Sequence, residues 1–96
     1  MATIEVRRAT DISKAEAKRR AESLARKMEA RLGIDWRWKG DLMLFDANRG
    51  AVRGMRGSVS VDGSSVRVAL DLPQGMRVYK CHVEDRLVDE LRRLFL

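Results

Sequence analysis

The sequence predicts an α+β fold, a two-layer sandwich in which an antiparallel sheet of about five strands carries two helices on one face. Segments with strand-like alternation are interrupted by two stretches with helical spacing, in the order strand, helix, four strands, helix. Turn signals separate the middle strands, so consecutive strands should pair antiparallel and leave one sheet face for both helices. The 96 residues are enough for one core, and we expect residues 1–96 to form a single domain.

The first predicted elements are a strand and a long helix. The segment from Thr3 to Arg8 alternates apolar and charged residues, as a half-buried strand does. Ser13 and Glu16 match a capping box, in which each side chain satisfies a free backbone N–H of the first helical turn. Gly33 predicts a left-handed stop after the helix. Apolar residues recur at helical spacing between these signals: Ala17, Ala21, Leu24, Met28 and Leu32.

A first hairpin is predicted from Asp35 to Asp46, around a two-residue turn at Gly40-Asp41. In that register, one face of the hairpin carries the large side chains Trp36, Trp38, Met43 and Phe45. The other face carries Arg37, Lys39, Leu42 and Leu44. The tryptophans should therefore lie under the helices as part of the core, since an RNA-binding sheet would instead present aromatic residues on its open face.

A second hairpin is predicted from Met55 to Leu72, around Asp62-Gly63. A two-residue turn there pairs Val59 with Val66 and Ser60 with Ser65, so that apolar residues meet apolar residues. Pro73 ends the last strand, because proline cannot donate to a sheet ladder. A final helix should follow, with its apolar face made by Val83, Leu87, Leu91 and Leu94, and with Val88 and Phe95 beside it.

Composition favours a soluble cytoplasmic protein. The chain has one cysteine, and hence no intramolecular disulfide, and it has no run of about 18 apolar residues that would span a membrane. Its N-terminus lacks the apolar stretch of a signal peptide. The net charge of +6 favours an anionic partner, such as nucleic acid, a membrane surface or an acidic protein. A free edge strand also leaves room for a homodimer.

Charge is sorted along the first predicted helix. Five cations fall on one flank: Arg19, Arg20, Arg26, Lys27 and Arg31. They could contact phosphates, and any such nucleic-acid binding would be non-specific because no base-reading motif accompanies them. The alternative is a solvated flank supported by Glu16–Arg20 and Glu22–Arg26 pairs.

The open sheet face is a second candidate surface. Its cations are Arg7, Arg37, Lys39, Arg56 and Arg67. Leu42 and Leu44 fall on the same face, where they either lie beneath the stems of Arg37 and Lys39 or form a small apolar contact site for a partner.

No catalytic constellation is predicted. Cys81 and His82 are adjacent, so on a helix their side chains diverge by about 100°. One cysteine and one histidine are too few for a structural zinc site, and the acidic residues form no recognisable acid–base pair. We therefore expect no enzyme activity, no cofactor and no metal. A ligand pocket between sheet and helices near Trp36 and Trp38 is a weaker hypothesis, which a void larger than a few water molecules would support.

Three stretches resemble a family of small bacterial proteins named for the polyhydroxyalkanoic acid system: TIEVRR, AEAKRRAESLARKMEARLGIDWRWKGDLMLF and GSVSVDGSSVRVALDLP. The most telling part is a W-x-G-D-x-L-x-F-like pattern, called the W-x-G-D pattern below, which is made by Trp38, Gly40, Asp41, Leu42 and Leu44-Phe45. The connection RGAVRGMRG after this pattern is longer and more basic than the family leads us to expect, and the approach to the first helix also departs from it.

The resemblance implies a non-enzymatic accessory role in storage-polyester metabolism, at or near the surface of cytoplasmic granules. A granule-coat or polyester-synthesis protein would be the partner. The family defines no site residues, so none is carried over to this chain.

Overall fold

The computed structural model describes residues 2–50 and 53–95, and it confirms the predicted fold class and element order. The elements are β1 (Ala2–Ala9), α1 (Lys14–Leu32), β2 (Asp35–Lys39), β3 (Leu42–Asp46), β4 (Arg56–Val61), β5 (Ser65–Leu72), a 3₁₀ helix η1 (Gln74–Tyr79) and α2 (Lys80–Leu94). The 3₁₀ helix η1 connects the last strand to α2.

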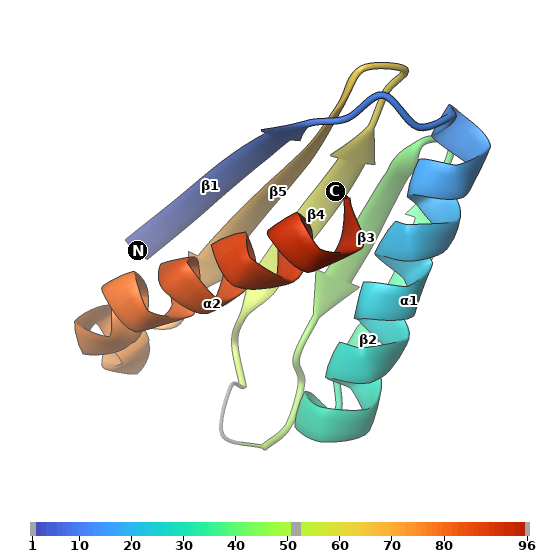
Figure 1. Cartoon of the computed structure of the whole chain (residues 1–96). Helices are drawn as coiled ribbons and strands as arrows, with labels where there is room; N and C mark the ends of the chain where they lie inside the picture. The colour runs from blue at the N-terminus through green and yellow to red at the C-terminus, as the bar shows by residue number, and fades with distance from the viewer. Residues whose placement is uncertain (1, 51–52, 96) are drawn as a thin grey trace.

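One antiparallel sheet of five strands, in the order β1-β5-β4-β3-β2, supports both helices on the same face (Figure 1). The N-terminal strand pairs with β5, which is more than fifty residues away along the chain. As a result β1 and β2 are the two edges of the sheet. Each edge strand is a place where a second copy could pair, as the sequence left open.

The core lies between the sheet and the helices. Its largest fully buried side chains are Ile4, Ile34, Met43, Leu72, Leu91, Val66 and Val68. From α1 the core receives small residues, such as Ala17 and Ala21, which let the helix approach the sheet closely. Gly57 in β4 leaves room for an aromatic ring, because the ring of Phe45 lies where the side chain of residue 57 would be. Trp36 and Trp38 pack against this core and are only partly buried, because β2 is an edge strand.

The first hairpin forms in the predicted register. Lys39 pairs with Leu42, and Trp36 pairs with Phe45. Gly40 has a positive φ of 65°, a conformation that glycine adopts without steric cost. Trp36, Trp38, Met43 and Phe45 therefore share the face that the helices cover, as predicted from the turn.

The predicted register of the second hairpin is wrong by two residues. The structure pairs Val59 with Val68 and Val61 with Val66. The backbone N–H of Asp62 donates to the carbonyl of Ser65 (3.1 Å), which places the turn one residue later than predicted. The side chain of Asp62 is the cause, because its Oδ1 accepts the N–H groups of Ser64 (2.7 Å) and Ser65 (2.6 Å). A shift of two residues keeps every side chain on its predicted face.

The predicted ends of α1 are confirmed. The Ser13 hydroxyl accepts the N–H of Glu16 (3.2 Å), and Gly33 ends the helix with a φ of 70°. The return half of the capping box is absent among the described contacts. Instead the Glu16 carboxylate accepts two hydrogen bonds from Arg19, at 2.9 and 2.6 Å.

Candidate functional site

The outer face of the sheet, which neither helix covers, is the first candidate surface (Figure 1). One cross-strand row on it is Arg7, Arg67, Ser60, Leu42 and Lys39. The neighbouring row is Glu5, Ala69, Ser58, Leu44 and Arg37. Small or apolar residues fill most of the middle of both rows, and charged residues stand at the ends. We call Leu42, Leu44, Ser58, Ser60 and Ala69 the outer strip.

Charged residues of both signs border the outer strip: the cations Arg7, Arg37, Lys39, Arg56 and Arg67, and the carboxylates Glu5, Asp46 and Asp71. Arg67 is paired, because its Nη2 donates to Oε2 of Glu5 at 2.6 Å. Arg7, Arg37 and Lys39 make no ion pair within the described part of the chain. The surface thus combines a small apolar centre with a border of mixed charge, in which Arg7, Arg37 and Lys39 carry positive charge without an ion pair among the described residues.

The structure brings together four of the predicted surface residues. Arg37 lies directly opposite Leu44, and Lys39 lies directly opposite Leu42. Both leucines are half-buried although no helix covers them. This geometry suits both sequence-based interpretations, since the leucines can be shielded by the stems of their charged neighbours and still offer contact area.

The other five predicted residues lie on α1, in the layer behind the sheet, and so form no common surface with the outer strip. Acidic partners on the same helix hold two of them. Arg19 pairs with Glu16 at 2.6 Å, where the sequence suggested an Arg20–Glu16 pair. Arg26 pairs with Glu22 at 3.1 Å, as predicted, and its guanidinium lies 5.8 Å from the centroid of the Trp36 ring.

Two more of these cations face α2. Lys27 pairs with Glu90 at 3.1 Å, and Arg20 donates to the carbonyl of Leu94 at 2.7 Å. Only Arg31 of the five has no hydrogen bond or ion pair among the residues described. Most cations of this flank therefore serve structural contacts. Two form ion pairs within α1, and two link α1 to α2.

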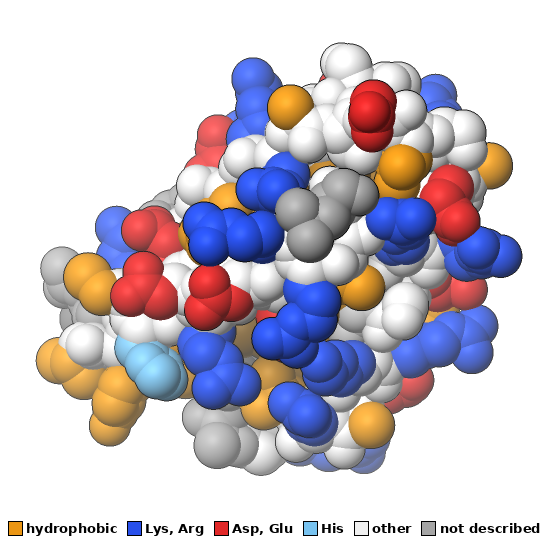
Figure 2. Space-filling model, in the orientation of Figure 1, with side chains coloured by type: hydrophobic (Ala, Val, Ile, Leu, Met, Phe, Trp, Pro, Cys, Tyr) orange, Lys and Arg blue, Asp and Glu red, His pale blue; other side chains and the backbone are white. Residues whose placement is uncertain are grey.

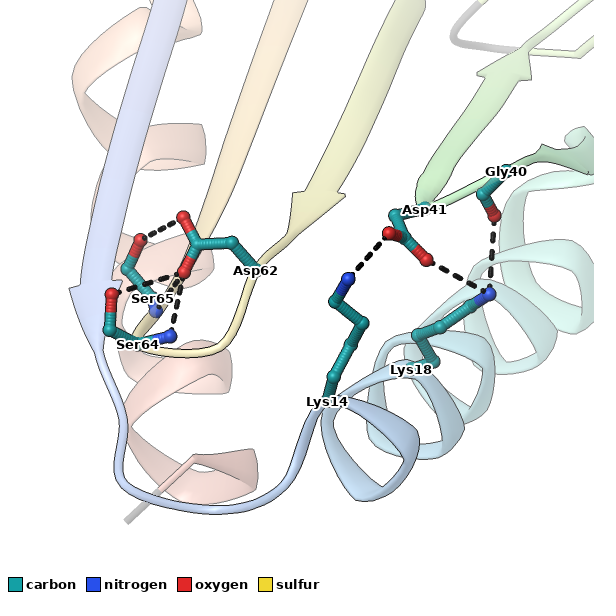
Figure 3. Close-up of polar contacts among 7 residues, drawn as sticks. All are labelled: Lys14, Lys18, Gly40, Asp41, Asp62, Ser64 and Ser65. Atoms are coloured by element: carbon teal, nitrogen blue, oxygen red, sulfur yellow. Dashed lines mark hydrogen bonds and ion pairs between the residues drawn. The ribbon is translucent and has the colours of Figure 1, made fainter.

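The turn between β2 and β3 is tied to the first two turns of α1 (Figure 3). Oδ2 of Asp41 accepts from Lys14 at 2.7 Å, and Oδ1 accepts from Lys18 at 3.4 Å. Lys18 also donates to the carbonyl of Gly40 at 3.2 Å. Hydrogen bonding and charge from Lys14 lower the pKa of the Asp41 carboxyl, and the same contact raises the pKa of Lys14.

Trp38 continues this contact along α1. Its indole Nε1 donates to Oε1 of Glu22 at 2.9 Å, and the ammonium of Lys18 lies 4.8 Å from its ring centroid. The indole hydrogen bond, followed by the contact with Arg26, lowers the pKa of Glu22. The tryptophan, glycine and aspartate of the W-x-G-D pattern therefore all hold α1 against the edge of the sheet.

A groove between α1 and α2 is a site that the sequence did not predict. Its volume is about 300 Å³, and neither tryptophan lines it. Beneath α1, a space lined by Met43 and Phe45 measures only about 20 Å³. The groove draws its lining from both helices, β5, η1 and the approach to β4, so no local sequence pattern could have revealed it.

Cys81 and His82 lie at the start of α2, and both are exposed. No group of three or more potential metal ligands occurs among the described residues. Likewise, none of the helices in the described ranges is long and apolar enough to cross a membrane.

The fold and these surfaces define a small two-layer α+β protein whose sheet is open on one face. Residues 4–95 match the family model described as "Putative polyhydroxyalkanoic acid system protein". The chain belongs to this family, the one that its sequence resembles. No curated protein and no solved structure matches the chain.

Proposed function

We propose that this protein is a non-enzymatic accessory protein of polyhydroxyalkanoate metabolism that acts by binding at the surface of storage granules. Family membership supports the metabolic setting. The observation that carries the binding role is the outer strip, an uncovered sheet face on which half-buried leucines lie opposite the unpaired cations Arg37 and Lys39.

The outer strip has the composition of a protein contact surface. Protein interfaces combine an apolar centre with a polar rim, and charged residues are depleted from their centre. Here Leu44, Ser58 and Ala69 supply a flat centre, while Arg37 and Lys39 supply a basic rim. A partner with an acidic surface, such as a granule-coat or polyester-synthesis protein, would meet both features.

The test is to separate granules from polyester-accumulating cells and to measure how much of the protein stays with them across a salt series. We expect Leu42→Thr/Leu44→Thr to reduce retention at high salt, because threonine keeps the strand and removes the apolar contact. Arg37→Gln/Lys39→Gln should reduce retention chiefly at low salt, where charge attraction is least screened.

Arg92→Gln is the matched control, since this exposed arginine lies on α2 and away from the outer strip. It should leave retention unchanged. Absence of the wild-type protein from granules at every salt concentration would overturn the proposal.

A nucleic-acid role for the α1 cations is the alternative that remains to be measured. The contacts of the described residues do not favour it, because four of the five cations already have partners. Binding of the wild-type protein to single-stranded DNA, lost on charge reversal of Arg26 and Lys27, would support it.

A further inference from the structure

The groove between α1 and α2 has an almost wholly apolar lining. Its floor is formed by buried residues of the sheet layer and its walls by the two helices. The apolar lining residues are Leu24, Met28, Leu32, Met55, Leu70, Leu72, Met76, Val83 and Leu87. The volume of about 300 Å³ falls at the lower end of the range typical of small-molecule sites.

Positive charge predominates at the rim of the groove. Lys27, Arg31 and Arg86 reach it, and Glu90 is the one acidic residue among the described residues that line the groove. The Glu90 carboxylate is already compensated, because Lys27 lies 3.1 Å and Arg93 lies 3.6 Å from its Oε1. Arg31 and Arg86 make no hydrogen bond or ion pair with any described residue. Two guanidinium groups, one from each helix, are thus left at the mouth of an apolar groove.

We propose that this groove binds an anionic amphiphile, namely a linear apolar chain of medium length that ends in a carboxylate. The apolar lining would hold the chain, and the guanidinium groups of Arg31 and Arg86 would bind the carboxylate through charge-assisted hydrogen bonds. A neutral chain would leave the cations without a partner, and a cationic head group would be repelled by them.

The lining favours a flexible chain over a rigid ring. Met28, Met55 and Met76 come from three separate segments, and unbranched thioether side chains adapt their shape to irregular ligands.

Figure 2 shows this side of the molecule, with hydrophobic side chains visible between Lys and Arg side chains in the region of the two helices.

This inference does not depend on the proposed function. The groove lies in the helix layer, whereas the outer strip lies on the opposite face of the sheet. Purified protein without granules is sufficient to test it, so the two proposals can fail separately.

The experiment titrates the ¹⁵N-labelled protein with decanoate and follows backbone amide shifts, with calorimetry for affinity. We expect saturable shifts at groove residues such as Met28, Val83 and Leu87, and none along the outer strip. Butyrate should bind about tenfold more weakly or worse, because it buries fewer methylene groups. Decanol and decylamine should also bind more weakly than decanoate, because neither has an anionic head group.

The decisive variant is Arg31→Gln/Arg86→Gln, which removes both cations from exposed positions and leaves the apolar lining unchanged. We expect decanoate affinity to fall about tenfold or more, with decanol affinity unchanged. Arg92→Gln is the control on the same helix, and it should bind decanoate as the wild type does.

Three outcomes would overturn the proposal. The first is the absence of saturable shifts in the groove, and the second is equal decanoate affinity in the double variant and the wild type. The third is a second copy as the occupant, seen as a dimer in sedimentation that Leu32→Asp dissociates. The exposed edge of Leu32 at the groove is where such a contact would form.

Discussion

At the scale of single residues, Gly57 shows how a missing side chain shapes this core. A Cβ at this position would overlap the ring of Phe45 and would lie 2.7 Å from the carbonyl oxygen of Ala69, which is a backbone atom that cannot move aside cheaply. We expect Gly57→Ala to lower the free energy of unfolding by about 1–3 kcal/mol, measured by urea denaturation.

Gly63→Ala is the matched control for Gly57. Apart from its two chain neighbours, no described residue has an atom within 4 Å of a Cβ built at Gly63, and this glycine does not have a positive φ. The control should change stability by less than about 0.5 kcal/mol. Equal losses in the two variants would contradict the close packing of Phe45 on Gly57.

Arg8 is a second residue with a measurable consequence. It pairs with Val66 on the helix-facing side of β1, and its Nε is buried without a hydrogen-bond partner among the described residues. A buried donor without a partner is costly, so Arg8→Met should raise the unfolding free energy by about 1 kcal/mol. Arg7→Met, on the exposed outer face, should change it little. Marked destabilisation by Arg8→Met would mean that Arg8 has a partner in solution.

At the scale of elements, the start of α1 depends on one hydroxyl. The Ser13 side chain is the cap of the helix, and it satisfies the N–H of Glu16. Ser13→Ala should lower the unfolding free energy by about 1 kcal/mol, while Ser13→Asp should retain stability because aspartate is also a good cap. Thermal denaturation would measure both.

Ser23→Ala provides the comparison within the same helix. Ser23 is exposed in the middle of α1, where alanine has the higher helix propensity. This variant should therefore lose no stability. A loss equal to that of Ser13→Ala would show that the effect belongs to the helix interior and not to the cap.

The two hairpins show why element-level prediction succeeded in one place and failed in another. The backbone at Gly40 has a positive φ, and a glycine in a two-residue turn predicts this conformation directly. Asp62-Gly63 carries an equally strong signal, but the Asp62 carboxylate accepts the N–H groups of Ser64 and Ser65 and moves the turn (Figure 3). Side-chain hydrogen bonding to the backbone outweighed the dipeptide preference.

At the scale of the whole molecule, stability should depend on pH through groups that join elements or close turns. The pKa of Asp62 is lowered by the backbone N–H groups of Ser64 and Ser65, and those of Asp41 and Glu22 are lowered by their contacts with α1 and Trp38. A carboxyl with a lowered folded-state pKa stabilises the fold above its unfolded pKa. That contribution is lost as the pH falls through the folded pKa.

We therefore expect the urea midpoint to fall on acidification from pH 6 to pH 3. The raised pKa of Lys14 predicts a second loss at the alkaline end, as the pH rises through that pKa. An Asp41→Asn/Asp62→Asn variant should be less stable at pH 6 and should show a weaker acid dependence. An unchanged acid dependence in this variant would assign the effect to the general rise in positive charge.

Most of the architecture was predictable because its causes are local. Ser13 and Gly33 mark the ends of α1, and strict alternation assigns each strand residue to a face. Even the misplaced second turn kept Val59 and Val66 on the helix-facing side, because a shift of two residues preserves the alternation. The arrangement of Arg37, Lys39, Leu42 and Leu44 on the open face followed from the first turn in the same way.

The placement of the other candidate residues depends on contacts between distant segments. The sequence gives no partner for Lys27, yet in the structure it pairs with Glu90, which lies sixty-three residues later in the chain. The five α1 cations and the outer strip fall in different layers, so a charge count along one helix could not show which cations remain unpaired.

The boundaries, periodicities and turn glycines of this chain thus specify the elements and the faces of its strands, because each arises from interactions within a few residues. The packing of α1 and α2 side by side on the sheet decided three further features. These are which cations are neutralised, which contacts the W-x-G-D residues make, and where a groove opens. Such packing depends on the shapes of side chains that come into contact only after the chain has folded. Contacts of this kind produce no periodic pattern in the sequence.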